Sequence, residues 1–277
     1  MKMKILGSGQ DGGIPHTGCF CDLCILARKD HRYRRLGPSV AIADLDDDLC
    51  FLVDASPDFK IQLDTVIEEN LKTKRGGKIP LDGILLTHSH FGHIGGLWHL
   101  GREVLEENEL PIYATRKIHQ FFQENYPFNL LIKNRNVRIE EIESQKMFEL
   151  DGVKVLPIKV PHRDEIGDTV AYVIESKRRV LYMPDLDKWT PTLLEMVRNC
   201  EVALIDGTFH SRKEVSGFEN TPHPPILETV RLLEGADAEI VFVHINHTNP
   251  VNRNGTERKH LENKGFKIAF DGMEIPI

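Results

Sequence analysis

The apolar positions of the chain follow two periodicities that alternate along its length. Residues 39–56, "SVAIADLDDDLCFLVDAS", alternate and then run apolar, which predicts a β-hairpin with its turn at 45–48. Residues 57–72 repeat apolar positions at helical spacing from a proline onwards, which predicts a helix. The same reasoning predicts further strands at 3–9, 81–88, 110–115, 137–142, 146–150, 153–160, 169–176, 178–185, 201–208 and 239–246, a last strand pair in 265–277, helices at 95–108, 116–127, 190–200 and 224–237, and a loop at 74–80.

Groups of strands therefore alternate with helices throughout the chain. No internal repeat, linker or low-complexity tract interrupts this order. Since each sheet must bury an apolar face, the pattern predicts two sheets packed together with helices outside them. We expect a four-layer α/β/β/α sandwich in one domain, 1–277, with a cysteine-rich loop at about 10–36 after the first strand.

Composition limits the kinds of partner that the protein is expected to bind. The chain has 277 residues with a formal net charge of −7, which does not suggest a basic nucleic-acid footprint. The basic cluster "ARKDHRYRR" at 27–35 is better explained as a solvated surface than as a phosphate-binding site. No apolar run approaches the length of a membrane span, and the N-terminus has no signal-peptide pattern. We expect a cytoplasmic protein acting on a small molecule, with neither membrane nor nucleic acid as partner and with a homodimer left open.

Three histidines gather where a predicted buried strand ends. His88 and His90 are two residues apart, so their side chains point the same way from an extended segment. His93 follows where a helix is expected to begin, and it can face the same space from the other side. Neutral imidazole is the commonest metal ligand in proteins, and it suits zinc or iron. The spacing predicts a metal site rather than a histidine-rich surface loop.

Other candidate ligands also stand at the ends of predicted strands. His162 closes one strand, Asp185 closes another, and His244 lies at the end of a third. Open α/β sheets place their chemistry at such edges. Each residue alone is better explained by a structural role, but together with the first three histidines they favour one metal centre. A metal held by histidines and a carboxylate lowers the pKa of its bound water, which predicts hydrolysis.

Three of the five cysteines crowd together as "CFCDLC". Cys19, Cys21 and Cys24 have the spacing of ligands to tetrahedral zinc, which needs a fourth ligand from elsewhere in the chain. Cys50 and Cys200 are rivals for that place, but each lies in or beside an apolar run and is expected in the core. In a reducing compartment the crowding favours a metal over disulfides.

The motif "THSHFGHIGGL" resembles the His-x-His-x-Asp-His signature of the metallo-β-lactamase fold superfamily, and the strand-end residues Asp54, His162, Asp185 and His244 recur in its order. Two branches are most similar: the cyclic phosphodiesterase of the carbon–phosphorus lyase pathway and the PQQ synthesis protein B-like proteins. Both share a start like "GSGQDGGIPHTGCFCDLC". The end "FDGMEIPI" resembles the first branch, and "HTNP" after His244 resembles the second.

The resemblance implies roles for individual residues. His88, His90, His162 and Asp185 would hold a first metal, and His93, Asp185 and His244 a second, which in the family also has an aspartate where this chain has Gly92. Asp187, Asp164 or Asp58 could supply that carboxylate. We expect one firmly bound ion of Zn, Mn or Fe and a second that is weak or absent. The resemblance further implies Asp54 as the acceptor that orients a ligand histidine, His223 as a catalytic acid beside the catalytic Asp185, and His247 as fourth ligand to a structural zinc with Cys19, Cys21 and Cys24.

These residues support three hypotheses for function. The main one is a metal-dependent hydrolase, with a small phosphodiester, cyclic or linear, as substrate. The alternative is an iron-dependent oxygenase, since the PQQ synthesis branch is associated with oxygen-dependent hydroxylation of a tyrosine-derived or peptide precursor. The third is a metal-binding protein without catalysis, because Gly92 removes a ligand. A transfer-RNA-processing nuclease ranks below these, since the chain shows no extended basic arm.

Overall fold

The computed structural model describes residues 1–44, 49–70, 81–163, 165, 167–214 and 222–277. The predicted turn at 45–48, the predicted loop at 74–80 and Asp164 lie outside these residues. The first sheet has the strand order β14-β1-β2-β3-β4-β5-β6. Its strands are β1 (Lys2–Gly7), β2 (Ser39–Asp44), β3 (Leu49–Val53), β4 (Gly83–Leu85), β5 (Leu110–Thr115), β6 (Val137–Ile142) and β14 (Glu274–Pro276).

The second sheet has the order β13-β12-β11-β10-β9-β8-β7. Its strands are β7 (Phe148–Leu150), β8 (Val153–Val160), β9 (Thr169–Glu175), β10 (Arg179–Met183), β11 (Val202–Asp206), β12 (Glu239–Val243) and β13 (Lys267–Ile268). In each sheet one half is an antiparallel meander and the other half is parallel. The parallel strands bring their carboxyl ends to one edge of each sheet, and the candidate ligands follow these ends.

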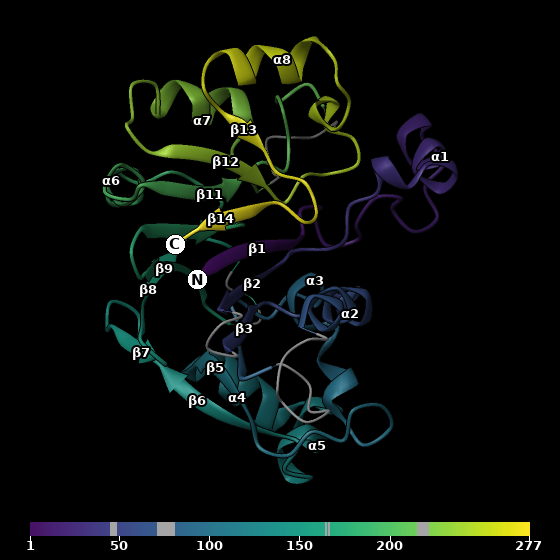
Figure 1. The fold of residues 1–277 in the computed structure, drawn as a ribbon, viewed down its shortest axis with the longest axis vertical. Helices are drawn as coiled ribbons and strands as arrows, with labels where there is room; N and C mark the ends of the chain where they lie inside the picture. The colour runs from purple at the N-terminus through teal and green to yellow at the C-terminus, as the bar shows by residue number, and fades with distance from the viewer. Residues whose placement is uncertain (45–48, 71–80, 164, 166, 215–221) are drawn as a thin grey trace.

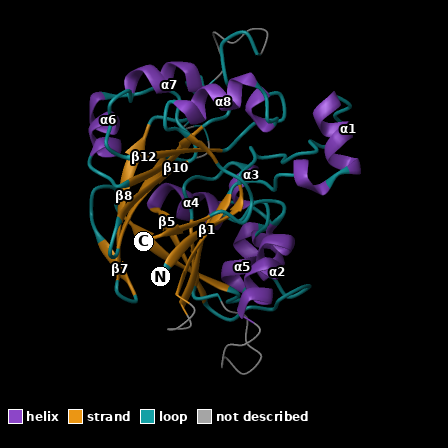
Figure 2. Cartoon of the chain, turned by 45° about the horizontal axis from the view of Figure 1, so that its top comes forward, coloured by secondary structure: helices purple, strands orange, loops and turns teal. Residues whose placement is uncertain are grey.

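Helices cover the outer face of each sheet, so the molecule has four layers (Figures 1 and 2). Apolar side chains of α2 (Phe59–Asn70), α4 (Arg116–Glu124) and α5 (Phe128–Lys133) pack on the first sheet. Those of α6 (Pro191–Arg198), α7 (Ile226–Leu232) and α8 (Thr256–Asn263) pack on the second. The α/β/β/α sandwich expected from the sequence is confirmed. No helix in the described part of the chain combines the length and apolarity needed to cross a bilayer.

The central core lies between the two sheets. Alternate residues of each strand point to the same face, so Val153 and Val155 of β8 and Tyr172 of β9 reach the same core as Ile5 and Val40 of the first sheet. The hydroxyl of Tyr172 donates to the carbonyl of Leu86, 2.6 Å away, in the segment that leads to the histidines. The packing of the two sheets therefore sets the distance between the site residues that each sheet contributes.

The helix predicted at 95–108 is wrong. A short helix, α3 (Phe91–Ile94), and a 3-10 helix, η2 (Leu97–Leu100), take its place. The amide of Gly96 donates to the carbonyl of Ala55, 2.8 Å away, instead of continuing the helical ladder. A Cβ at Gly96 would lie 2.3 Å from the carbonyl oxygen of Ser56, so tertiary contact with the neighbouring segment fixes this backbone. Packing has overridden the apolar spacing.

Two further expectations need correction. The cysteine-rich loop contains a helix, α1 (Asp22–Lys29), which stands away from the two sheets (Figures 1 and 2). The predicted last strand pair is not a pair, because β13 joins β12 in the second sheet and β14 joins β1 in the first. Helices α5 and α8 are additions to the predicted elements.

Candidate metal centre

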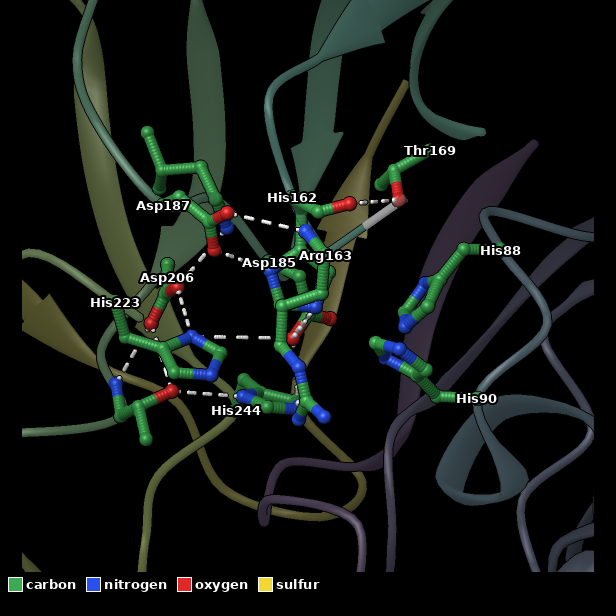
Figure 3. A network of polar contacts seen from close by, with 12 residues as sticks. His88, His90, His162, Arg163, Thr169, Asp185, Asp187, Asp206, His223 and His244 are labelled. Carbon is green, nitrogen blue, oxygen red and sulfur yellow. Dashed lines mark hydrogen bonds and ion pairs between the residues drawn. The ribbon is translucent and has the colours of Figure 1, made fainter. Parts of the chain in front are cut away.

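The six predicted metal ligands meet at one end of the sandwich. His88 and His90 follow β4, His162 follows β8, and His244 follows β12. Figure 3 shows His88 and His90 directed across the site toward His162 and His244, which come from the other sheet. The ring centroid of His88 lies 4.6 Å from that of His90 and 5.2 Å from that of His162. The sequence placed these residues at strand ends, and the two parallel sheet edges bring them together.

Two groups of ligand atoms share this space. The first comprises His88, His90 and His162, with ligand atoms within 4.8 Å of one another. The second comprises His93 and His244, whose rings stack 5.6 Å apart, together with Asp11. Asp185, which follows β10, lies between the groups.

The Asp185 carboxylate contacts both groups. Its Oδ2 is 3.2 Å from Nε2 of His93, and its Oδ1 is 3.4 Å from Nε2 of His244 and 3.7 Å from Nε2 of His162. This carboxylate is therefore placed to bridge two cations.

Hydrogen bonds from the first sheet fix the tautomers of its histidines. The hydroxyl of Thr87 donates to the buried carboxylate of Asp54, so it must accept a hydrogen bond from Nδ1 of His88, 2.9 Å away. Nδ1 of His93 donates to Oδ2 of Asp54 at 2.7 Å. In both rings Nε2 is therefore the nitrogen that faces the site, and it can bind a metal in its deprotonated form. Asp54 thus lies where the resemblance places an orienting acceptor.

The second sheet repeats this arrangement. The hydroxyl of Thr208 donates to the carboxylate of Asp206, so it accepts from Nδ1 of His244 at 2.8 Å. Nδ1 of His223 donates to the other oxygen of Asp206 at 2.6 Å. Nδ1 of His162 is oriented separately, by Oδ1 of Asp187 at 3.0 Å.

Several buried atoms in the site have no hydrogen-bond partner among the described residues. They are Nε2 of His88, His93 and His244 and Oδ2 of Asp185. A buried polar atom without a partner costs about 1–3 kcal/mol, and four such atoms around one space call for an occupant. Divalent cations satisfy all four, so the residues present fit the metal that the fold implies.

Burial and charge separate the pKa values of the site. Burial lowers the pKa of His88 well below its ordinary value. Burial also opposes the protonation of His93, but the carboxylates of Asp54 and Asp185 outweigh it and raise its pKa well above the usual range. For His223, burial is likewise outweighed by Asp206, which raises the pKa to about 9. Burial disfavours ionised Asp185, yet the surrounding imidazoles hold its pKa well below the usual range.

The backbone at three of these residues is strained. Asp54, His223 and His244 have φ angles of 65°, 77° and 58°, in the left-handed region that non-glycine residues seldom adopt. Asp54 and His244 stand directly after strands β3 and β12, and His223 stands three residues before α7. Strain of this kind is held only where the surrounding structure fixes the conformation, and it gathers at functional sites.

The cysteine cluster forms a second candidate metal site. Sγ of Cys19 and Sγ of Cys21 each lie 3.6 Å from Nδ1 of His247, and Cys24 completes the group. Zinc bonds of about 2.3 Å to sulfur and about 2.0 Å to nitrogen in tetrahedral geometry separate the two ligand atoms by about 3.5 Å. The spacing therefore fits zinc. The rivals Cys50 and Cys200 are buried in the apolar clusters outside the two sheets.

Sequence reasoning missed Asp206, Thr87, Thr208 and Asp11 as members of the site. Asp206 could have been found, since it closes a predicted strand in the same manner as Asp54 and Asp185. The two threonines could have been inferred from their place beside strand-end aspartates and histidines. Asp11 lies in a glycine-rich turn after β1, where sequence alone predicts only a change of direction.

The fold and the site together define a class of protein. Residues 50–245, more than half of the chain, match the family described as the beta-lactamase superfamily domain, and the chain belongs to this family. Its relatives include coenzyme PQQ synthesis proteins. It is 28% identical over 306 residues to coenzyme PQQ synthesis protein B of Rhizobium meliloti (strain 1021), with 100% of this chain and 98% of that protein covered. It is 30% identical over 305 residues to the same-named protein of Methylobacterium radiotolerans, with both chains fully covered.

Solved structures give the same picture. The Zn²⁺-bound PqqB from Methylobacterium extorquens superposes with a TM-score of 0.83 at 28% identity, covering 100% of both chains. A diphosphatase from the PhnP family superposes with a TM-score of 0.74 at 25% identity, covering 99% of this chain and 96% of that one. Both branches expected from the sequence are thus among its relatives, and the PqqB structure superposes with the higher TM-score and the higher identity of these two.

Proposed function

We propose that the histidine cluster is a divalent-metal centre and that the chain is a metal-dependent enzyme of the PQQ synthesis protein B-like branch. The observation that carries this proposal is the set of buried Nε2 atoms of His88, His93 and His244, which have no hydrogen-bond partner among the described residues and converge with Asp185. His88, His90, His162 and Asp185 would hold one ion. The metal would supply an activated oxygen species or a polarised substrate oxygen at this place.

For the reaction, we favour the oxygen-dependent hydroxylation of a small tyrosine-derived or peptide substrate over phosphodiester hydrolysis. In this hydroxylation one oxygen atom of dioxygen enters the substrate, and the other leaves as water with two protons and two electrons from an external reductant. The likeness to PQQ synthesis protein B over both full chains supports this choice. The ligands are imidazoles and carboxylates without a thiolate, and that set accepts iron as well as zinc or manganese. The small-molecule substrate and the cytoplasmic location expected from the sequence stay predictions.

Hydrolysis is the second candidate, and one observation favours it. Asp206 holds His223 so that its Nδ1 is 3.9 Å from Oδ1 of Asp185. A histidine fixed beside the bridging carboxylate is placed to give a proton to the oxygen of a leaving group. The likeness to the diphosphatase from the PhnP family supports the same chemistry.

We further propose that Cys19, Cys21, Cys24 and His247 hold a structural zinc. The cluster ties the N-terminal loop to the segment that follows β12, because His247 lies three residues beyond His244. A site with four protein ligands leaves no open position for substrate, so its binding free energy would stabilise the fold.

Metal analysis combined with turnover tests the function. The purified protein is loaded with Fe²⁺ under anaerobic conditions, or with Zn²⁺ or Mn²⁺. Dioxygen uptake is measured with a tyrosine-containing peptide and a chemical reductant, and hydrolysis with bis(para-nitrophenyl) phosphate. We expect uptake that depends on Fe²⁺ and on the peptide. Hydrolysis without uptake would replace the first candidate with the second.

His90→Ala removes one proposed ligand, and we expect it to lose the histidine-site ion and turnover with the fold intact. His119→Ala is the matched control, since His119 pairs on the surface with Glu141 at 2.7 Å. Equal metal content in the two variants would refute the metal centre.

A further inference from the structure

Gly92 stands where the family has an aspartate ligand, and another residue fills the space of that side chain. A Cβ at Gly92 would lie 1.9 Å from Oδ1 of Asp11 and 2.4 Å from its Cγ. Non-bonded atoms do not approach so closely, so the two side chains exclude each other. The carboxylate of Asp11 occupies the volume that an aspartate at position 92 would need.

The Asp11 carboxylate is directed at the same partners. Its Oδ1 lies 3.5 Å from Nε2 of His93 and 3.5 Å from Nε2 of His244. Both nitrogens are buried, and neither makes a hydrogen bond within the described part of the chain. Ligand atoms at about 2.0–2.1 Å from a tetrahedral cation are about 3.4 Å apart. The spacing is therefore that of ligands around a common ion.

Backbone pairing carries Asp11 to this place. Gly9 forms a parallel bridge with Ile245, the residue after His244. The amide of Ile245 donates to Ser8 at 2.9 Å, and the amide of Gln10 donates to Ile245 at 3.1 Å. The position of Asp11 is thus fixed to the strand that delivers His244, although more than two hundred residues separate them in sequence.

The carboxylates considered from the sequence are engaged elsewhere. Asp58 accepts from the amide of Gly37 at 2.8 Å, and Asp187 accepts from His162 and from the amide of Arg163. Asp164 lies outside the described residues. Asp11 was not among these candidates.

We propose that Asp11 is the carboxylate ligand that completes the second metal subsite with His93, His244 and Asp185, in place of the side chain that Gly92 lacks. The centre then takes two divalent cations, which replaces the expectation of a second ion that is weak or absent. This inference rests on the proposed metal centre, and its test separates the two. The ligands of the second subsite are two imidazoles and two carboxylates, a set suited to Mn²⁺, Fe²⁺ or Zn²⁺.

The test moves the carboxylate between the two positions. Mn²⁺ alone serves as the probe, because it prefers nitrogen and oxygen ligands and leaves the thiolates of the cysteine site aside. Its stoichiometry and affinity are measured by calorimetry on the full chain. The variants are Asp11→Asn, Gly92→Asp and the double variant Asp11→Gly with Gly92→Asp. Asp22→Asn, an exposed carboxylate of the same N-terminal segment, is the matched control.

We expect two Mn²⁺ ions for the wild type and for Asp22→Asn. Asp11→Asn should weaken one of them by at least about tenfold. The Gly92→Asp variant should also lose the second Mn²⁺ ion, because its side chain clashes with the carboxylate of Asp11. The double variant should bind this ion again. A merely structural role for Asp11 would not be rescued from position 92. The inference is overturned if Asp11→Asn keeps both ions with unchanged affinity, if the double variant stays at one, or if the wild type binds one ion only. A wild type that binds none overturns the metal centre itself.

Discussion

Asp206, the last residue of β11, supports the site, and its replacement by asparagine has a calculable effect. Its Oδ1 accepts from the amide and the hydroxyl of Thr208, and its Oδ2 accepts from the amide of Leu186 and from Nδ1 of His223. An asparagine side chain keeps one oxygen acceptor. Its NH₂ group would replace the other oxygen and would face donors that it cannot accept from. A buried amide such as that of Leu186, left without an acceptor, costs about 1–3 kcal/mol.

The second part of the effect depends on pH. In metal-free protein the pKa of His223 is about 9, against an ordinary value of 6.5, because Asp206 outweighs burial. A pKa raised by folding contributes stability that is fully present below pH 6.5 and is lost as the pH rises through 9. At about 1.4 kcal/mol per pKa unit the contribution is about 3 kcal/mol. Asp206→Asn removes it, so the difference in unfolding free energy between wild type and variant should shrink by about 3 kcal/mol from pH 6.5 to pH 9.

Urea unfolding of metal-stripped protein at a series of pH values measures this difference. Asp271→Asn is the control, since Asp271 is a carboxylate bonded to Ser8 and to the amide of Leu36, without a histidine partner among its described hydrogen bonds. The Asp271→Asn variant should have a lower free energy of unfolding than the wild type, by an amount that does not change with pH across this range. Parallel curves for wild type and Asp206→Asn across this range would refute the assigned role of Asp206.

Three further predictions concern the cysteine site and the core. Cys21→Ser should lose one zinc per chain by elemental analysis and lower the melting temperature, whereas Cys50→Ser should keep the zinc. Burial raises the pKa of the Cys24 thiol to about 12, so zinc uptake near pH 8 should release its proton, seen with a pH indicator, and apparent zinc affinity should rise with pH. Leu204→Ala, in the core between the sheets, should cost about 2–5 kcal/mol in urea unfolding, and a smaller loss would contradict the packing described.

The sequence was most informative where a pattern of apolar residues, or a group of ligand residues, lies within a few consecutive positions. The apolar residues Val153 and Val155, on either side of Lys154, predict a strand, and strand β8 is confirmed. The histidines could be found because strand ends and ligand chemistry coincide in "LLTHSHFGH". These are local signals, since period and residue type are both read within a few positions.

The failures come from contacts between segments far apart in sequence. Apolar spacing predicted a helix at 95–108, but the amide of Gly96 bonds to Ala55 and the helix ends. The two final strands were predicted to pair because they are close in sequence. Instead, the carbonyl of Met273 accepts a hydrogen bond from the amide of Ile5, and β14 joins the first sheet. Asp11 was missed because its place depends on the pairing of Gly9 with Ile245. Periodicity carries no information about such partners.

Each sheet orients two histidines of the site by the same arrangement of side chains. In each, an aspartate after a strand binds a threonine hydroxyl, and the two together orient two histidines: Asp54 with Thr87, and Asp206 with Thr208. Each half orients two rings through these bonds, and the distance between the halves remains to be set. The apolar core between the sheets sets that distance, and Asp185 spans it, with Oδ2 toward His93 of one half and Oδ1 toward His244 of the other. A change in sheet packing should therefore alter metal affinity before it alters the orientation of any single histidine.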